Sequence, residues 1–214
     1  SEPAGQACAS CHHPDFAFVD PDKGLPVSEG VIPGLFGGRN SPSAAYAMYA
    51  PIFHFDEGEG LWIGGQFWDG RATGDVLGDP LADQALGPFL NPVEMANPDK
   101  AAVIADVAAS EYADLFKQVW GKNSLKNVDK AYDRVALSIA AFERTGLFGQ
   151  FTSKYDAYLA DCLALGGDMA ECAQGIGPEA EIAGQIFGKK EWEGLQLFMG
   201  ENNNDGILEV GEGA

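Results

Sequence analysis

The chain has 214 residues, 46% of them hydrophobic and 21% charged, so it can bury the core of one large domain. Its formal net charge of −19 argues against nucleic-acid binding, because phosphate recognition needs clustered Lys and Arg. This acidity favours a positively charged protein partner, or else only keeps an exported protein soluble. No apolar run approaches the roughly 18 residues of a membrane span.

Residues 1 to about 96 are rich in Gly and Pro and show little helical periodicity, as expected for loops wrapped around a cofactor. The pattern changes at Asn97, which with Pro98 predicts the start of a helix that continues through residues 101–108. Ser110 predicts the cap of a second helix. On that helix three apolar residues share a face: Leu115, Phe116 and Val119.

Further helical patterns cover residues 129–144 and 153–165, and a last one covers 179–199 with a break near Gly188. No segment alternates between apolar and polar residues over a useful length, so we expect no substantial strand. The predicted fold class is mainly α.

The strongest motif is Cys8-Ala9-Ser10-Cys11-His12, which has the C-x-x-C-H pattern of covalent haem attachment. Two thiols bind the haem vinyl groups and the adjacent His becomes the proximal ligand of the iron. One short turn can present both sulfurs and the imidazole on the same face. A zinc or redox C-x-x-C is the alternative, and the following His argues against it.

The sequence contains no clear protein ligand for the opposite, distal side of the iron. His13 adjoins the proximal ligand, His54 lies between two Phe residues in an acidic loop and reads as a surface residue, and Met95 looks structural. An open distal position is therefore favoured, and open haem iron binds small ligands such as peroxide.

Cys162 and Cys172 are the remaining cysteines. A local disulfide between them is the simplest assignment, and two buried free thiols are the alternative. Attached haem and a disulfide both indicate an oxidising compartment, so we expect a periplasmic or surface-exported protein. No signal peptide is visible before Ser1, and we expect that any export signal has been removed or left out.

Several segments together resemble the bacterial di-haem cytochrome c peroxidase/MauG family. In chain order they are residues 39–42 (RNSP), 66–71 (QFWDGR), 84–95 (QALGPFLNPVEM) and 141–145 (AFERT). The resemblance covers nearly the whole chain. It implies a cytochrome c-like haem domain with long Gly/Pro-rich loops and peripheral helices.

The resemblance also implies roles for single residues. Gln84 and Glu94 match the polar residues over the peroxidatic haem, and Pro88 lines the same pocket. Trp68 matches an electron relay between two haems, and Asn40 matches a calcium ligand at the domain boundary. The chemistry agrees, since a carboxylate can move a proton between the peroxide oxygens and an amide can orient the substrate.

Two features depart from the family. Only one C-x-x-C-H motif is present, so we expect this chain to be part of a longer polypeptide whose second haem lies beyond Ala214. The expected domains are 1–178, which carries the peroxidatic haem, and 179–214, the start of a second cytochrome c-like domain. The loop that carries a displaceable distal His in many members matches residues 31–38, which contain no His. Residues 50–64 and 74–79 are apparent insertions.

The acidic tail resembles a calcium loop of the EF-hand type, with a Gly at its sixth position. An acidic insertion without calcium is the alternative. The candidate ligands are Glu201, Asn203, Asp205, Ile207 and Glu212.

The sequence therefore predicts a haem c peroxidase that reduces hydrogen peroxide. Its electrons come from a small cytochrome c or cupredoxin through a second haem in the remaining half of the protein. A MauG-like enzyme that oxidises Trp or Tyr of a partner protein is the first alternative, and an electron-transfer cytochrome with His54 as sixth ligand is the second. A homodimer is compatible with the sequence.

Overall fold

A computed structural model of the chain describes residues 5–22, 24–167, 172 and 186–199. The chain divides into two compact units, 1–149 and 150–214.

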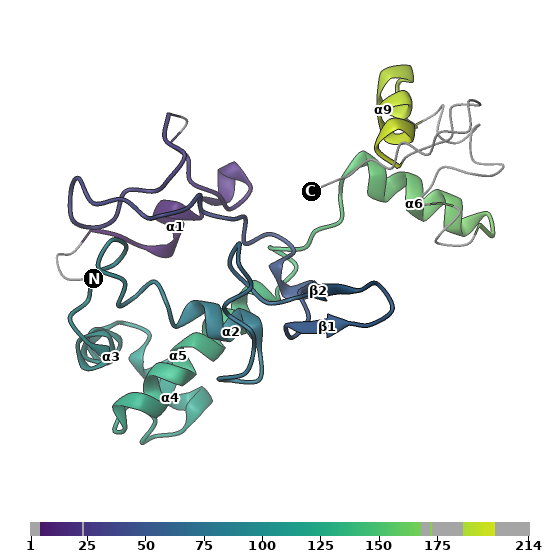
Figure 1. The fold of residues 1–214 in the computed structure, drawn as a ribbon. Coiled ribbons are helices and arrows are strands. Elements are labelled where there is room, and N and C mark those ends of the chain that lie inside the picture. Colours follow the sequence, from purple (N-terminus) through teal and green to yellow (C-terminus); the bar gives the residue numbers. More distant parts are fainter. Residues whose placement is uncertain (1–4, 23, 168–171, 173–185, 200–214) are drawn as a thin grey trace. The chain divides into compact units, whose positions relative to one another are not determined.

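The first unit is mostly helical, as predicted, with one small sheet (Figure 1). Its two strands, β1 (His54–Asp56) and β2 (Leu61–Ile63), pair antiparallel, with His54 opposite Ile63. The elements in chain order are α1 (Cys8–Cys11), the short 3-10 turns η1 (Pro14–Phe16) and η2 (Ala47–Tyr49), β1 (His54–Asp56), β2 (Leu61–Ile63), α2 (Pro80–Ala85), α3 (Lys100–Ala109), α4 (Ala113–Trp120) and α5 (Val128–Glu143).

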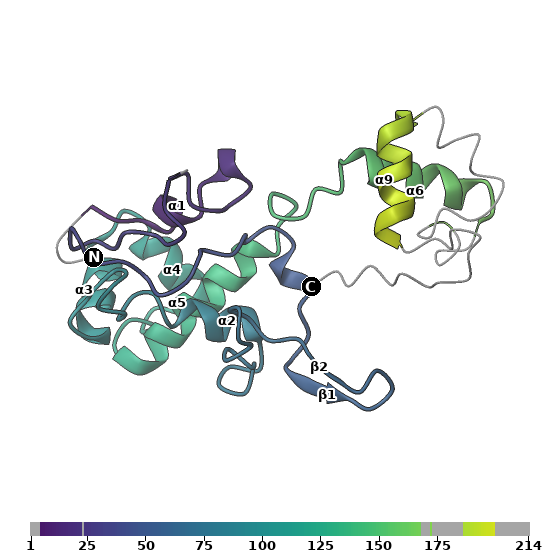
Figure 2. The same cartoon turned by 45° about the horizontal axis from the view of Figure 1, so that its top comes forward.

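Helix α5 is the centre of this unit, and it lies among α2, α3 and α4 in both views (Figures 1 and 2). Asn127 caps it by accepting a hydrogen bond from the Lys130 amide at 2.9 Å. One side of α5 packs Ala131 and Tyr132 against α3, and Ala140 packs against α2. Burial of these faces, rather than helix propensity, holds the short helices in place.

Two predicted helix starts were wrong by a few residues. Asp99, not Asn97, caps α3 by accepting a hydrogen bond from the Ala102 amide at 2.8 Å. The Asn97 side chain is buried and donates to the Phe89 carbonyl instead. Ser110 follows the end of α3 and donates to the Val107 carbonyl, and Tyr112 precedes α4.

The apolar face predicted on α4 is only partly buried. Phe116 is buried, whereas Leu115 and Val119 are exposed. Two residues four apart stay on the same side of a helix, so this side of α4 faces away from the core.

Helix α2 was not predicted, and neither was the way in which Asp79 and Asp83 organise the insertion at 74–79. The Asp83 side chain is buried and accepts hydrogen bonds from the amides of Gly74, Val76 and Leu77 at 2.8–3.1 Å. Asp79 caps α2 and pairs with Arg144 at 2.7 Å, which ties the start of α2 to the end of α5.

The β1–β2 hairpin occupies the other insertion, residues 50–64, for which no strand was predicted. Each strand has only three residues, too few for a clear alternating pattern. His54 begins β1 and is exposed.

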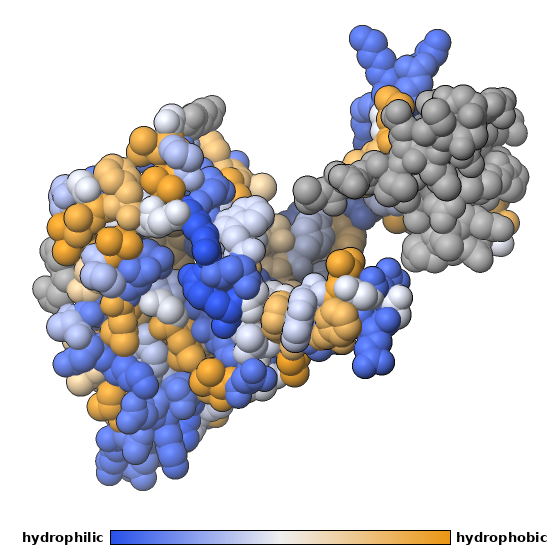
Figure 3. Space-filling model, viewed as in Figure 1, coloured by the Kyte–Doolittle hydropathy of each residue, from blue (hydrophilic) through white to orange (hydrophobic). Residues whose placement is uncertain are grey.

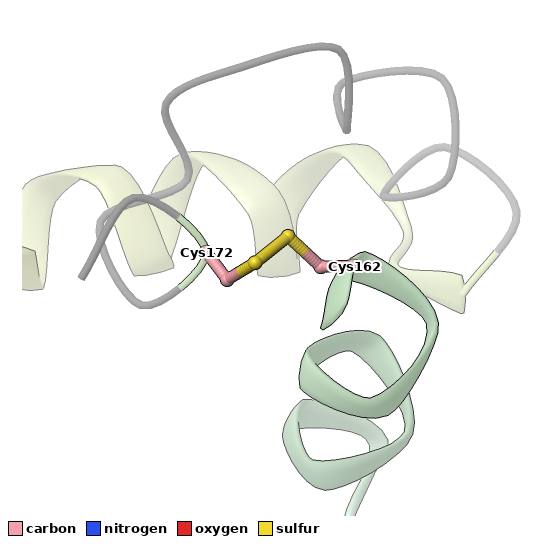
Figure 4. Close-up of a disulfide and its surroundings, with 2 residues drawn as sticks. All are labelled: Cys162 and Cys172. Atoms are coloured by element: carbon pink, nitrogen blue, oxygen red, sulfur yellow. A yellow bond between two sulfur atoms is a disulfide. The ribbon is translucent and has the colours of Figure 1, made fainter. Parts of the chain in front are cut away.

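The second unit contains α6 (Lys154–Ala164) and α9 (Lys189–Met199). Cys162 of α6 forms a disulfide with Cys172 (Figure 4), as the sequence indicated. The Tyr158 ring lies 5.3 Å from Phe187 and 6.0 Å from Trp192 between centroids. These contacts join α6 to the segment around α9 within the second unit. The predicted domains, 1–178 and 179–214, stay a prediction.

The assignment of residues 179–214 to a second haem domain stays a prediction. Helix α9 begins directly after Gly188, where the break was expected. The candidate calcium loop at 201–212 lies outside the described residues. Among the helices that the structure describes, none combines the length and the apolar character needed to cross a membrane.

Candidate active site

A cavity of about 890 Å³ in the first unit brings together the residues that the sequence singled out. Its walls come from segments between Gln6 and Phe148. The predicted site residues that line it are Cys8, Cys11, His12, Asn40, Trp68, Gln84, Pro88 and Glu94. Their separation along the chain, from α1 to the loop after α2, explains why spacing alone could not join them.

The C-x-x-C-H motif forms the single helical turn α1, which the His12 amide closes by donating to the Cys8 carbonyl at 2.9 Å. Cys8 and Cys11 are therefore three residues apart on one side of a turn, and neither is in a disulfide. The Ser41 hydroxyl donates to the Cys11 carbonyl at 2.7 Å and fixes the end of the turn.

The ring of His12 has a defined orientation. Its Nδ1 lies 3.0 Å from the Phe18 carbonyl oxygen, and since a carbonyl only accepts, Nδ1 carries the proton. Nε2 then keeps its lone pair for a metal. A backbone carbonyl bonded to the far nitrogen is the usual way in which proteins orient a histidine ligand.

The cavity fits a haem c group. Its volume falls within the range of cofactor pockets. Two free thiols and an oriented imidazole lie on its wall, together with aromatic rings that suit a flat macrocycle. The rings are those of Phe18, Phe67, Phe89, Phe142 and Phe148.

Glu94 lies half-buried in the cavity wall. Asn91 Nδ2 donates to Glu94 Oε1 at 2.7 Å, which leaves Oε2 for another partner. Burial raises the pKa of the carboxyl above its ordinary value, while the Asn91 hydrogen bond and the charge of Arg71 oppose the rise. A more basic carboxylate is a better proton acceptor near neutral pH.

The loop that lacks a distal His begins beside Glu94. The Val31 amide donates to the Glu94 carbonyl at 2.8 Å. Gly30 approaches so closely that an added Cβ would lie 2.3 Å from the Val93 carbonyl oxygen. Glycine is therefore required at position 30 for the loop to contact the Glu94 backbone.

Gln84 and Pro88 reach the cavity from the end of α2 and the turn that follows it. The Met95 amide donates to the Pro88 carbonyl at 3.2 Å, and the Ala96 amide donates to the Asn91 carbonyl at 2.9 Å. These bonds fold residues 88–96 back on themselves. The segment between Gln84 and Glu94 thereby places both side chains on one cavity.

Trp68 and Asn40 are directly linked, since Trp68 Nε1 donates to the Asn40 carbonyl at 2.9 Å. The indole is 66% exposed, although it also lines the cavity. Next to it, Asp69 pairs with Arg39 at 2.6 Å and with Arg71 at 2.8 Å. The Arg39 hydrogen bond, followed by those of Arg71, holds the pKa of Asp69 well below its usual range.

Glu143, for which no role was predicted, lines the cavity at the end of α5. Burial raises its pKa to about 7, the charge of Arg144 opposes this rise, and Asp79 adds to it. The AFERT segment gave the only signal for this residue. His54, considered as a sixth ligand, is not among the residues that line the cavity.

Comparison with known proteins agrees with the geometry. Residues 1–162 match the family described as di-haem cytochrome c peroxidase. The chain is 46% identical over 160 residues to the methylamine utilization protein MauG of Paracoccus denitrificans, an alignment covering 73% of this chain and 40% of that protein. It is 31% identical over 153 residues to the cytochrome c551 peroxidase of Pseudomonas aeruginosa, covering 72% and 36% respectively.

Among solved structures, the di-haem peroxidase BthA of Burkholderia thailandensis superposes with a TM-score of 0.66 at 34% identity, covering 74% of this chain and 38% of that one. The chain thus spans about two fifths or less of the length of these relatives. The family match, which covers most of the chain, and the cavity that unites the C-x-x-C-H motif with Gln84 and Glu94 lead to one conclusion: the chain belongs to the di-haem cytochrome c peroxidase family.

Proposed function

We propose that this chain is the peroxide-reacting part of a di-haem enzyme that reduces hydrogen peroxide to water. One observation carries the proposal: a single cavity is lined by Cys8, Cys11 and His12 and also by Gln84 and Glu94. A haem attachment site and a raised-pKa carboxyl on the same cavity are the parts that peroxide cleavage needs.

When bound, haem c supplies an iron that takes the peroxide and delivers electrons to it. Each peroxide consumes two electrons and two protons and yields two waters. The Glu94 carboxylate accepts the proton of the near peroxide oxygen and returns it to the departing one. The Gln84 amide orients the substrate and stabilises the charge that develops, and Asn91 holds Glu94 in place.

The electrons reach this site, in our proposal, from a second haem in the part of the protein beyond this chain. Trp68 relays them, and a small cytochrome c or cupredoxin supplies them. The Trp68 indole is exposed and lies on the cavity wall, which supports its role as the relay. Calcium bound near Asn40, and at the loop of residues 201–212, belongs to the same proposal.

A second function is supported by two particular observations. The chain is 46% identical to a MauG protein over 160 residues, and the loop at 31–38 contains no His. A MauG-like enzyme would use peroxide to oxidise Trp or Tyr residues of a partner protein. The disulfide of the second unit supports export to an oxidising compartment. Such a location is compatible with both functions.

The test uses the complete haem-loaded protein. Denaturing intact-mass spectrometry counts the haems on each polypeptide, and we expect two. Hydrogen peroxide is then added with a reduced cytochrome c, and oxidation of the cytochrome is followed by absorbance. Glu94→Gln should lower turnover by about a hundredfold or more, whereas Glu111→Gln, at an exposed acid outside the cavity lining, should leave it unchanged.

Slow cytochrome oxidation with covalent change in a partner protein would favour the MauG-like function. One haem on each polypeptide, with no haem-bearing partner, would remove the relay and the assignment of Trp68. A haem iron that fails to react with peroxide would contradict both functions.

A further inference from the structure

The loop that begins at Gly30 has a defined backbone conformation. The Gly30 amide donates to the Leu35 carbonyl at 2.8 Å, and the Leu35 amide donates to the Ile32 carbonyl at 3.1 Å. Gly34 is the third residue of the turn that the second bond closes, and its φ of 82° is the value that a type II turn requires there. We call residues 30–35 the Gly30 loop.

The apolar side chains of the Gly30 loop contribute little packing that could fix its position. Ile32 is 38% exposed, Leu35 is 40% exposed, and Phe36, which follows the loop, is also 40% exposed. Figure 3 shows hydrophobic residues at the surface in the part of the first unit where Figure 1 draws the N-terminal segments. Hydrogen bonds therefore largely determine where this loop lies.

Glu29 connects the Gly30 loop to the haem attachment turn. Its Oε1 accepts a hydrogen bond from the Gly34 amide at 2.6 Å, across the loop. Its backbone carbonyl accepts a second bond, at 3.0 Å, from Nε2 of Gln6, which lies two residues before Cys8. An isolated antiparallel bridge between Glu29 and Phe36 closes the base of the loop. Hydrogen bonds to a charged acceptor are stronger than neutral ones, so the Glu29 carboxylate is well suited to hold the loop closed.

The Gly30 loop also contacts the backbone that carries Glu94. Gly30 leaves no room for a Cβ beside the Val93 carbonyl, and the Val31 amide donates to the Glu94 carbonyl at 2.8 Å. Glu29, Gly30 and Glu94 all line the cavity. A movement of the loop away from this backbone would remove a hydrogen bond from the Glu94 peptide group and admit water to its side chain.

We propose that Glu29 is a positioning residue that holds the Gly30 loop against the backbone of Glu94. The inference rests on the proposed function, because Glu94 is the proton acceptor of that function. Glu29 does not itself act on peroxide, and no bond to it forms or breaks during the reaction. Its carboxylate fixes the loop, and the loop fixes the place of Glu94 in the cavity wall.

An effect of the Glu29 charge alone is the alternative. Glu29 also lines a second cavity, of about 290 Å³, whose wall includes Asp20 and Asp22. In the described part of the chain no group of three or more His, Cys, Asp or Glu is placed to hold a metal ion. Glu29→Ala removes the charge and the hydrogen bond, whereas Glu29→Gln removes only the charge, since its amide oxygen still accepts from Gly34. The two variants therefore separate the hydrogen bond from the charge.

The first experiment measures loop opening in the complete haem-loaded protein by hydrogen–deuterium exchange and mass spectrometry. In Glu29→Ala we expect the amides of residues 30–37 to exchange about tenfold faster than in the wild type, the low end for loss of a hydrogen bond to a charged group. Glu29→Gln should lie much nearer to the wild type. Glu111→Ala, at an exposed acid outside the cavity lining, is the matched control and should change nothing. Unchanged exchange in Glu29→Ala would overturn the proposal.

The second experiment measures whether the loop positions Glu94, from the rate of the ferric protein with peroxide at several pH values. Surface loops open at little free-energy cost, so a tenfold shift leaves the loop open much of the time, and the rate in Glu29→Ala should fall about threefold. Its acid limb should lie at lower pH than in Glu29→Gln, because burial raises the pKa of Glu94 and water would reduce that effect. A role in stability alone would not move the limb.

Two results of the second experiment would overturn the proposal. If Glu29→Ala exchanges faster but keeps the wild-type rate and acid limb, the loop does not position Glu94. If Glu29→Ala and Glu29→Gln change the limb equally, the charge acts rather than the hydrogen bond. A wild-type protein that does not react with peroxide would contradict the proposed function instead, and the exchange measurement, which requires no turnover, would still decide whether Glu29 holds the loop.

Discussion

Asn91 and Glu94 form a side-chain hydrogen bond of 2.7 Å in the wall of the cavity, with the amide donating to Oε1. The bond stabilises the ionised carboxylate, whereas burial stabilises the protonated form, and burial is the larger effect. The balance between the two sets the pH at which Glu94 can accept a proton.

Glu94→Gln should slow the reaction of the ferric protein with peroxide by about a hundredfold or more, the usual contribution of a positioned base. In the wild type the rate should fall as the pH drops through the pKa of Glu94, which lies above its ordinary value of 4.5. Stopped-flow absorbance at the haem Soret band measures both effects. Retention of the wild-type rate and pH profile in the variant would remove Glu94 from the mechanism.

Asn91→Ala should raise the pKa of Glu94 further, because it removes a hydrogen bond to the charged form. The acid limb of the peroxide reaction should therefore move to higher pH, while the rate well above it changes little. Asn91→Asp keeps the acceptor for the Val93 amide and adds a negative charge, so it should shift the limb in the same direction. A shift to lower pH in either variant would contradict the assignment.

Gly30→Ala should displace the Glu94 backbone, because its Cβ would lie 2.3 Å from the Val93 carbonyl oxygen. We expect a stability loss of about 1–3 kcal/mol, as for other overpacked sites, and a slower reaction with peroxide. Gly24→Ala is the matched control, since its added Cβ meets nothing within 4 Å and Gly24 does not line the cavity. Denaturant titration and the peroxide assay should separate the two variants.

Glu143→Gln should stabilise the protein at pH 8 more than at pH 5. Burial raises the pKa of Glu143 to about 7, so the folded state prefers the neutral carboxyl. Its stabilising contribution is complete below the unfolded value near 4.5 and is lost as the pH rises through 7. At pH 8 the substitution should increase the free energy of unfolding by at most about 3 kcal/mol, because the pKa of Glu143 differs by two to three units between the folded and unfolded states. A gain that does not depend on pH would point to packing instead.

Replacing both Cys162 and Cys172 by Ser should destabilise the second unit. The bridge closes a loop with a sequence separation of 10, for which the chain-entropy model gives about 3 kcal/mol. The fluorescence of Trp192, which packs against Tyr158 in this unit, reports its unfolding. The reaction with peroxide should be unaffected, because neither cysteine lines the cavity.

The long helices were predictable because their signals are local. Caps and apolar spacing over ten or more residues identified α3, α5 and α6, with errors at their starts. Asn97 and Asp99 are both good caps, and only the three-dimensional contact of Asn97 with the Phe89 carbonyl decides between them. The two three-residue strands and the six-residue α2 were too short to show periodicity.

Single residues of the site could be predicted from the sequence, but their arrangement around one cavity could not. The C-x-x-C-H motif identifies the haem by itself, but Gln84 and Glu94 were found only through the family resemblance. Nothing in the sequence near Glu143 indicates a buried carboxyl, since its burial comes from segments far away in the chain. The same holds for Gly30, whose necessity depends on the carbonyl of Val93.

Helix α5, with 16 residues, contributes side chains both to the hydrophobic core and to the cavity wall. Ala131, Tyr132 and Ala140 fill the hydrophobic core, while Ile139, Phe142 and Glu143 form a wall of the cavity. Variation that strengthens the core and variation that tunes the chemistry therefore act on the same short stretch of sequence. A substitution that shifts the position of α5 therefore acts on the hydrophobic core and on the cavity wall at once.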